Sequence, residues 1–211
     1  MTDYYEANFR PYLPEDRDAA ILDVGCGQGD FVRYLRGLGY RNITAVDIDE
    51  RAIATLEGLD GVTARRAEIG RELPADLPGP WDLIIAKQMI YYLERREAAS
   101  FVRSLAAALA KDGRLLVEIF NGSLVSSRFT ENKDPGIITA YTELGLKRLL
   151  EWNGLKVERM FGADAGGSFL YRTLRSLWVG IYCRLLMLER GRDDELPTIY
   201  EKSIIAVARR G

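Results

Sequence analysis

Short apolar runs alternate with amphipathic stretches along most of the chain. The apolar runs have the length of strands and fall at 20–24, 43–47, 62–65, 81–86, 114–119, 155–160 and 202–209. Apolar residues at helical spacing occupy 29–38, 50–58, 94–110 and 142–153. Gly39, Gly113 and Gly154 follow three of these stretches and predict where the helices end. The alternation predicts an α/β fold with a doubly wound, mostly parallel sheet.

No repeat or low-complexity linker divides the chain, so we expect a single domain over 1–211. Three segments fall outside the alternating pattern. They are the aromatic N-terminal arm 1–17, the polar loop 121–140 and the stretch 162–200, which holds a helical insertion before the last strand. The first half, 18–120, carries the most specific motifs.

Composition excludes several classes of function. Lys and Arg total 29 against 31 Asp and Glu, for a net charge of −2, which argues against nucleic-acid binding. The chain has no histidine, so any chemistry must run without imidazole. Cys26 and Cys183 are too far apart for a zinc motif, and we expect no metal. With neither a secretory signal nor a long apolar run, the sequence predicts a cytoplasmic protein.

The strongest motif is a glycine-rich turn between a strand and a helix. Gly25, Gly27 and Gly29 let the backbone turn sharply and approach a ligand closely. A dinucleotide-binding loop would carry a glycine at position 30, where this chain has Asp30. Because Asp23 and Asp30 would repel phosphates, the preferred ligand is cationic or neutral at this point. A tight turn without a ligand is the plain alternative.

A second acidic residue ends the next strand. Asp47 follows the apolar run directly and could accept hydrogen bonds from both hydroxyls of a ribose. Asp49 lies nearby, but it suits the N-cap of the helix that begins near position 50.

These two motifs resemble those of class I S-adenosylmethionine-dependent methyltransferases, whose first motif is an acidic residue followed by x-Gly-x-Gly-x-Gly. The specific resemblance covers 19–120. It implies a seven-stranded sheet with an antiparallel last strand, and S-adenosyl-L-methionine as cofactor. The residues implied in cofactor binding are Asp23 for the ammonium, Gly25, Cys26, Gly27 and Gly29 for the methionine end, Asp47 for the ribose and Ile48 for the adenine.

After the third strand, members of this family often carry an acid that accepts a hydrogen bond from the adenine amino group. This chain has Arg66 near that place, so Glu68 is only a substitute for the acid, and a backbone carbonyl is the alternative.

The turn after the fourth strand is expected to face the acceptor. Lys87 and Gln88 should overhang the crevice beside the cofactor, and Tyr92 is a candidate catalytic residue. For Tyr91 and Tyr92 the alternative is hydrophobic packing at a helix start. The Asn/Asp-Pro-Pro-aromatic sequence of enzymes that methylate nucleobase amino groups is absent, which disfavours that acceptor.

Two polar residues belong to the end of the fifth strand. Glu118 lies inside an apolar strand and is a candidate base, with a salt bridge to Lys or Arg as the alternative. Asn121 could orient an acceptor hydroxyl, although an Asn-Gly pair is also a plain turn.

The segment 171–190 predicts an amphipathic helix. Its apolar face contains Tyr171, Leu174, Leu177, Trp178, Ile181, Tyr182, Leu185 and Leu188, bordered by Arg172, Arg175, Arg184 and Arg190. Over 171–192 five arginines oppose one glutamate. A helix of this composition can lie on an anionic membrane surface, at the inner face of the membrane, or contact a lipid-linked acceptor, although packing is slightly favoured over either. The alternative is packing on the sheet or on a second subunit of a homodimer.

The sequence predicts a methyltransferase that acts on a hydroxyl of a sugar in a glycan or glycolipid, by loose likeness to small enzymes of bacterial surface-glycan pathways and polysaccharide biosynthesis. Other small-molecule acceptors, such as a quinone or a secondary metabolite, form the second hypothesis. A cofactor-binding protein without catalysis is the third. A nicotinamide-dependent oxidoreductase is disfavoured by Asp30.

Overall fold

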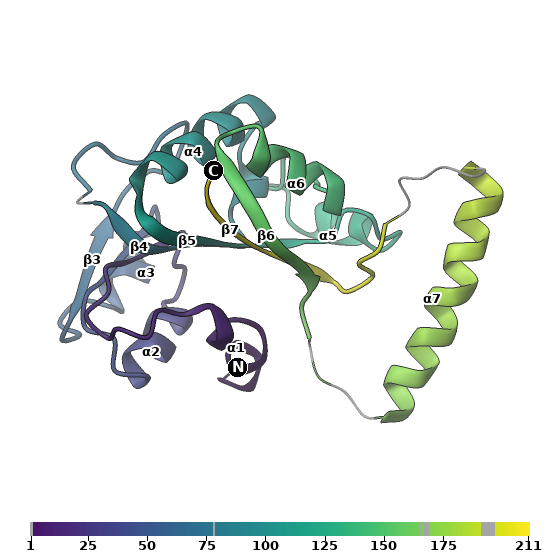
Figure 1. Cartoon of the computed structure of the whole chain (residues 1–211), viewed down its shortest axis with the longest axis horizontal. Coiled ribbons are helices and arrows are strands. Elements are labelled where there is room, and N and C mark those ends of the chain that lie inside the picture. The colour runs from purple at the N-terminus through teal and green to yellow at the C-terminus, as the bar shows by residue number, and fades with distance from the viewer. Residues whose placement is uncertain (1, 78, 165, 167–168, 191–196) are drawn as a thin grey trace.

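A computed structural model describes residues 2–77, 79–164, 166, 169–190 and 197–211 (Figure 1). Its centre is a seven-stranded sheet of order β3-β2-β1-β4-β5-β7-β6. The strands are β1 Ile21–Val24, β2 Ile43–Asp47, β3 Val62–Arg66, β4 Trp81–Lys87, β5 Leu109–Phe120, β6 Leu155–Gly162 and β7 Ser203–Arg210. Strands β1 to β5 pair in parallel, and β7 is antiparallel to both β5 and β6. The predicted fold class is confirmed.

Helices cover both faces of the sheet. They are α1 Thr2–Asn8, α2 Asp30–Gly37, α3 Glu50–Ala54, α4 Arg95–Ala108, α5 Ser127–Lys133, α6 Glu143–Glu151 and α7 Phe169–Arg190. Figure 1 shows α1 and α2 on one face and α4 and α6 on the other. One core gathers around Phe101 of α4 and the other around Phe31 of α2. Because the central strands are buried on both faces, they read as continuous apolar runs.

Two of the three predicted helix ends are confirmed. Gly39 and Gly154 lie just beyond α2 and α6 and have φ angles of +93° and +91°, a region that glycine occupies without steric penalty. The prediction for Gly113 is wrong. Helix α4 ends at Ala108, and Gly113 lies inside β5, where a Cβ atom would stand 2.6 Å from the carbonyl oxygen of Trp81. Glycine is required there by the close approach of β4.

Three stretches differ from their predicted form. The helix expected over 50–58 ends at Ala54, the predicted loop 121–140 contains α5, and the arm 1–17 contains α1 and a 3-10 turn, Arg10–Tyr12. The arm folds because its aromatic side chains have a partner surface. The rings of Tyr5 and Phe31 meet edge to face at a centroid distance of 4.9 Å.

One buried asparagine fixes α1 against the segment that follows β6. Asn8 is 1% exposed, and its side-chain amide donates to the carbonyl oxygens of Tyr4, at 2.8 Å, and Asp164, at 2.9 Å. Its Oδ1 accepts a hydrogen bond from the backbone N–H of Asp164 at 2.8 Å. The arm is therefore joined to a segment more than 150 residues away in sequence, which follows the carboxyl end of β6.

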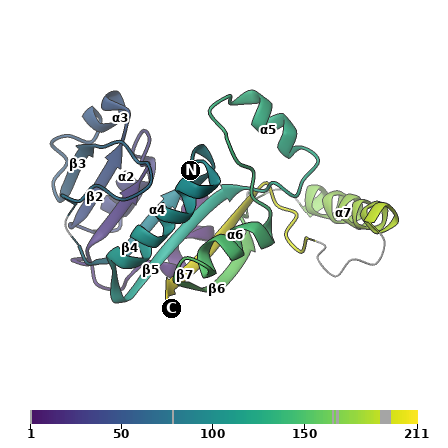
Figure 2. The same cartoon turned by 90° about the horizontal axis from the view of Figure 1, so that it is seen from above.

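Helix α7 stands apart from the two layers (Figures 1 and 2). The helix predicted over 171–190 is confirmed. Its side chains are largely exposed rather than packed on the sheet. None of the helices in the described ranges combines the length and the apolarity needed to span a bilayer.

We expect Asn8→Ala to lower the free energy of unfolding by about 2 kcal/mol, because it removes a buried side-chain amide that makes three hydrogen bonds. Urea denaturation followed by circular dichroism measures the change. Asn132→Ala is the matched control, since Asn132 makes an exposed bond to the carbonyl of Arg128 and should cost less than about 0.5 kcal/mol. Equal losses in the two variants would contradict the assignment.

Candidate functional site

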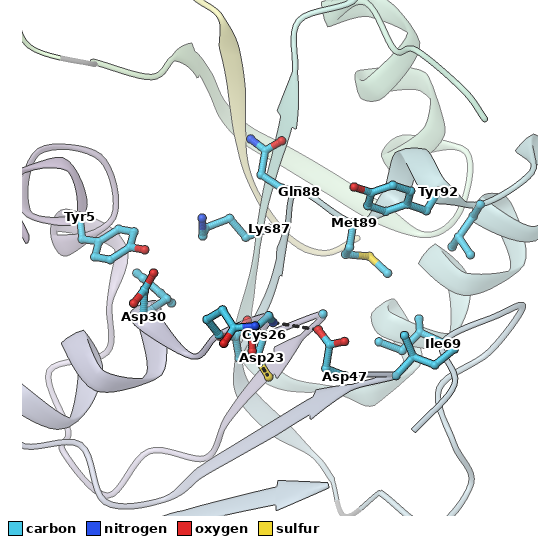
Figure 3. A pocket seen from close by; sticks show the side chains of 16 residues that line it. Tyr5, Asp23, Cys26, Asp30, Asp47, Ile69, Lys87, Gln88, Met89 and Tyr92 are labelled. Atoms are coloured by element: carbon cyan, nitrogen blue, oxygen red, sulfur yellow. Dashed lines mark hydrogen bonds between the residues drawn. The ribbon is translucent and has the colours of Figure 1, made fainter. Parts of the chain in front are cut away.

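A pocket of about 570 Å³ opens at the carboxyl ends of β1, β2 and β4 (Figure 3). Its lining is Tyr5, Asp23, Gly25, Cys26, Gly27, Gln28, Asp30, Phe31, Asp47, Ile48, Ile69, Lys87, Gln88, Met89, Tyr92 and Leu93. Strand order reverses between β1 and β4, and doubly wound sheets bind ligands at such a point. The topology therefore places the pocket where the glycine-rich turn begins.

The glycines of this turn have different structural roles. Gly25 and Gly27 line the pocket with φ angles of +73° and +52°. A Cβ atom on Gly27 would meet nothing within 4 Å, so its backbone faces open space. Gly29 does not line the pocket. It is the N-cap of α2, and a Cβ atom there would overlap the side chain of Leu56, so the glycine allows packing rather than ligand contact.

The carboxylate of Asp47 joins this turn to the end of β2. Its Oδ2 accepts a hydrogen bond from the N–H of Gly27 at 2.8 Å, drawn in Figure 3, and its Oδ1 accepts one from the N–H of Asp49 at 2.9 Å. Each oxygen keeps a further lone pair for a ligand. Asp49 itself caps α3 by accepting from the N–H of Arg51, as predicted. Ile48 follows Asp47, is 57% exposed and lines the pocket.

Asp23 places a carboxyl group at the floor of the pocket, where it is 2% exposed. Burial raises its pKa to about 7, the negative charge of Asp47 adds to the rise, and the ammonium of Lys87 opposes it. An ionised carboxylate in this place is unfavourable until a cation joins it. The site is therefore electrostatically suited to a positively charged ligand group.

Lys87 and Gln88 form the opposite wall, at the end of β4. The Nζ of Lys87 lies 3.6 Å from Oε2 of Glu118 and 5.6 Å from the ring centroid of Tyr5. Gln88 has a φ of +55°, a strained conformation for a residue other than glycine. Its Nε2 donates to Oε1 of Glu118 at 2.9 Å, and its backbone N–H donates to the carbonyl of Glu118 at 2.7 Å.

Glu118 lies behind this wall and contacts both Lys87 and Gln88. It is 3% exposed and is not part of the pocket lining, and its Oε1 also accepts a hydrogen bond from the hydroxyl of Tyr4 at 2.6 Å. Burial and the charge of Glu118 raise the pKa of Tyr4, so the hydroxyl remains a donor. Among the described residues, no group donates a hydrogen bond to Oε2, whose neighbour is Lys87. The ion pair weighed as the alternative for Glu118 is present, and Glu118 holds two lining residues in place.

The two tyrosines after β4 have different roles. Tyr91 is buried against Phe120 and donates to Oε1 of Gln88 at 3.0 Å, so packing accounts for it. Tyr92 is 41% exposed, lines the pocket and donates to Oδ2 of Asp134 at 2.6 Å. Burial and the carboxylate of Asp134 raise the pKa of Tyr92.

The structure gathers most of the predicted site residues in one pocket. They are Asp23, Gly25, Cys26, Gly27, Asp47, Ile48, Lys87, Gln88 and Tyr92. Glu68 is exposed and outside the lining, whereas the next residue, Ile69, is inside it. Asn121 is buried and also lies outside the lining. Its buried amide donates to the carbonyls of Ile199, at 2.8 Å, and Glu201, at 3.1 Å, and its Oδ1 accepts from the N–H of Ser123 at 2.9 Å, so it braces the backbone.

Several lining residues were not predicted as site residues. Tyr5 lies at one end of the pocket, and Ile69 and Met89 supply apolar surface on the side of Asp47 (Figure 3). Phe31 and Leu93 complete this apolar lining. The aromatic arm was a usable signal for Tyr5. The apolar residues carry no such signal, because a lining residue and a core residue have the same composition.

Comparison with known proteins identifies the family of this chain. A family model described as a methyltransferase domain matches residues 1–159. Ribosomal protein L11 methyltransferase from Aquifex aeolicus is 28% identical over 153 residues, which are 72% of this chain and 51% of that protein. The protein of the same name from Paraburkholderia phymatum is 34% identical over 71 residues, 33% of this chain and 23% of that protein. The chain thus spans about half or less of the length of these relatives.

Solved structures share the fold. An S-adenosylmethionine-dependent methyltransferase from Mesorhizobium loti has a TM-score of 0.68 at 20% identity, covering 100% of this chain and 98% of that one. Mitomycin 7-O-methyltransferase has a TM-score of 0.69 at 19% identity, covering 100% of this chain and 53% of that one. At these identities the likeness establishes the architecture.

The raised pKa of Asp23 predicts a pH-dependent effect of Asp23→Asn on stability without ligand. In the wild type, the stability that the protonated carboxyl confers is complete below the unfolded-state pKa near 4 and is lost as pH rises to about 7. We therefore expect the free energy of unfolding of the variant, relative to that of the wild type, to rise between these two pH values. Above pH 7 the rise should amount to on the order of 3 kcal/mol. Denaturation curves from pH 4.5 to 8.5 measure the gap, and a gap independent of pH would refute the prediction.

Proposed function

The chain belongs to the methyltransferase domain family, and we propose that it transfers a methyl group from S-adenosyl-L-methionine to a hydroxyl of a sugar in a glycan or glycolipid. When bound, this cofactor supplies a methyl group that its sulfonium has already activated. The chain's own task is then to hold the two reactants in line and to exclude water. The observation that carries the choice of a hydroxyl is the ammonium of Lys87 on the wall opposite the glycine-rich turn.

The pocket fits this cofactor on its own chemistry. The open backbone at Gly27 offers the close approach that the methionine end needs, and the buried carboxylate of Asp23 suits an ammonium. Asp47 would hold the ribose hydroxyls with its remaining lone pairs, while Ile48 and Ile69 would contact the adenine. The pocket's volume of about 570 Å³ is typical of small-molecule sites.

The acceptor wall favours an oxygen nucleophile. Lys87 presents an ammonium, which attracts a hydroxyl oxygen and repels an amine that is protonated at neutral pH. Glu118 fixes that ammonium and the amide of Gln88 from behind, so both are ordered before an acceptor arrives. Since Glu118 does not line the pocket, we assign it a positioning role in place of the base predicted from the sequence.

Aromatic rings support a sugar as the carrier of the hydroxyl. Tyr5 and Tyr92 both line the pocket, and ring faces of this kind pack against the apolar C–H faces of a pyranose. Another small molecule, such as a quinone or a secondary metabolite, is the second candidate, and the name of the structurally similar mitomycin 7-O-methyltransferase is in keeping with it. A protein acceptor, as the names of the L11 methyltransferases imply for those enzymes, is disfavoured where the accepting group is a cationic amine.

Transfer of radioactive methyl groups from labelled cofactor tests the proposal. Nucleotide sugars, lipid-linked oligosaccharides, phenols, quinols and ribosomal protein are offered in parallel, and the methylated atom is located by NMR. We expect incorporation into a sugar hydroxyl. Gly27→Val is the blank, because its side chain enters the open space at Gly27. Incorporation only into a phenol or a protein would replace the proposed acceptor, and cofactor binding without turnover on any acceptor would point to a binding protein.

Asp47→Ala should weaken binding of S-adenosylhomocysteine about 30-fold, close to 2 kcal/mol, because charge-assisted hydrogen bonds to two hydroxyls and to Gly27 are lost together. Isothermal titration calorimetry measures the affinity. Asp49→Ala is the control, since Asp49 caps α3 outside the pocket and its loss should change affinity less than about twofold. Equal affinities for wild type and Asp47→Ala would remove Asp47 from the site.

A further inference from the structure

Helix α7 exposes one continuous apolar face along its length. The outer face, as we name it, consists of Leu170, Leu174, Leu177, Trp178, Ile181, Leu185 and Leu188, which are 51–83% exposed. Apart from Trp178, these residues follow one another at steps of four, three, four, four and three. Such steps keep them on one side of a helix with 3.6 residues per turn. The outer face is therefore a stripe and not a scatter of single apolar residues.

The opposite side of α7 is held to the body of the protein. Nη1 of Arg175 lies 2.9 Å from Oε1 of Glu201, and the hydroxyl of Tyr182 donates to the carbonyl of Ser123 at 3.3 Å. The ring of Tyr182 also meets that of Tyr200 edge to face at 6.3 Å. Tyr182, expected on the apolar face, thus belongs to the anchoring side. These contacts involve other residues than those of the outer face, whose side chains stay exposed.

We propose that the outer face of α7 is a self-association surface that pairs with the same face of a second copy of this chain. At roughly 100 Å² of apolar area for each exposed side chain, the seven residues offer on the order of 600–700 Å² per copy. Two copies would bury ~1,200 Å² or more, the size at which stable interfaces begin. Soluble monomers rarely leave a contiguous apolar patch of this size exposed. A two-fold axis through the stripe buries the same residues on both copies and closes the assembly at a dimer.

The charges on α7 fit a second copy better than an anionic bilayer. Arg175 already pairs with Glu201, which leaves Arg184 as the exposed arginine beside the outer face among the side chains that the structure describes. The side chains of Tyr171, Arg172 and Arg190 lie outside that part. In sequence, three acidic residues follow at 193–195 and offset the basic excess. An interfacial membrane helix needs several cations bordering its apolar face, whereas a single arginine at the rim, as among the described side chains, suits a protein interface.

Sedimentation equilibrium of the full chain over a hundredfold range of concentration tests the proposal. We expect the mass of two chains for the wild type and of one chain for the double variant Leu177→Ser/Ile181→Ser, whose dissociation constant should rise at least 100-fold. Trp152→Ser is the matched control, because Trp152 is 78% exposed at the end of α6 and lies off the outer face. It should leave the dimer intact. All three proteins should keep their circular dichroism spectrum and their affinity for S-adenosylhomocysteine.

Three results would overturn the proposal. A wild type with the mass of one chain at every concentration excludes self-association. A dimer that persists in the double variant places the interface elsewhere. Flotation of a monomeric wild type with phosphatidylglycerol vesicles, but not with phosphatidylcholine vesicles, assigns the outer face to an anionic lipid surface instead.

Discussion

The hydrogen bond from the N–H of Gly27 to the carboxylate of Asp47 is the constraint on which the pocket depends. It fastens the turn after β1 to the end of β2, so that both line the same pocket opposite the end of β4. The bond also consumes the donor that Gly27 would otherwise offer to an anion. A turn that elsewhere cradles phosphates is here closed to them, and the two flanking acids, Asp23 and Asp30, reinforce that selectivity.

Around the same pocket, buried carboxyl groups outnumber the cations that could neutralise them among the described residues. The buried carboxyls of Asp23 and Glu118 act on one ammonium, that of Lys87, and the pKa of Asp23 stays near 7 despite this cation. A cationic ligand group beside Asp23 would stabilise the ionised form of this buried carboxyl and lower its pKa, which contributes to the binding free energy of the ligand. The left-handed backbone of Gln88 is a strained conformation, and its bonds to Glu118 hold it in place.

Local spacing explains which features the sequence could predict. Strands buried on both faces can be recognised as apolar runs. Asp23 and Asp47 lie at the ends of two such strands, and Gly27 lies in the turn that follows the first, so short sequence motifs reveal them. The roles of Glu118, Asn121 and Gly113 depend instead on partners remote in sequence. Tyr4 lies 114 residues from Glu118, and Ile199 lies 78 residues from Asn121. A buried polar residue signals that a partner exists, but only the fold shows whether the partner is a ligand or the chain itself.

The clamp of Asn8 on Asp164 bears on how the molecule is made. Helix α1 precedes every strand of the sheet in synthesis. Glu6 of α1 bonds to Tyr34 of the early helix α2, but Tyr4 and Asn8 bond to Glu118 and to the segment after β6. On the ribosome the aromatic side chains of α1 can pack on α2 early, but the hydrogen bonds of Tyr4 and Asn8 must wait until β5 and β6 have emerged. A helix that is made before the sheet thus gains its last anchors only after most of the sheet is made. A nascent chain without β5 and β6 lacks both of these anchors and cannot close this end of the pocket.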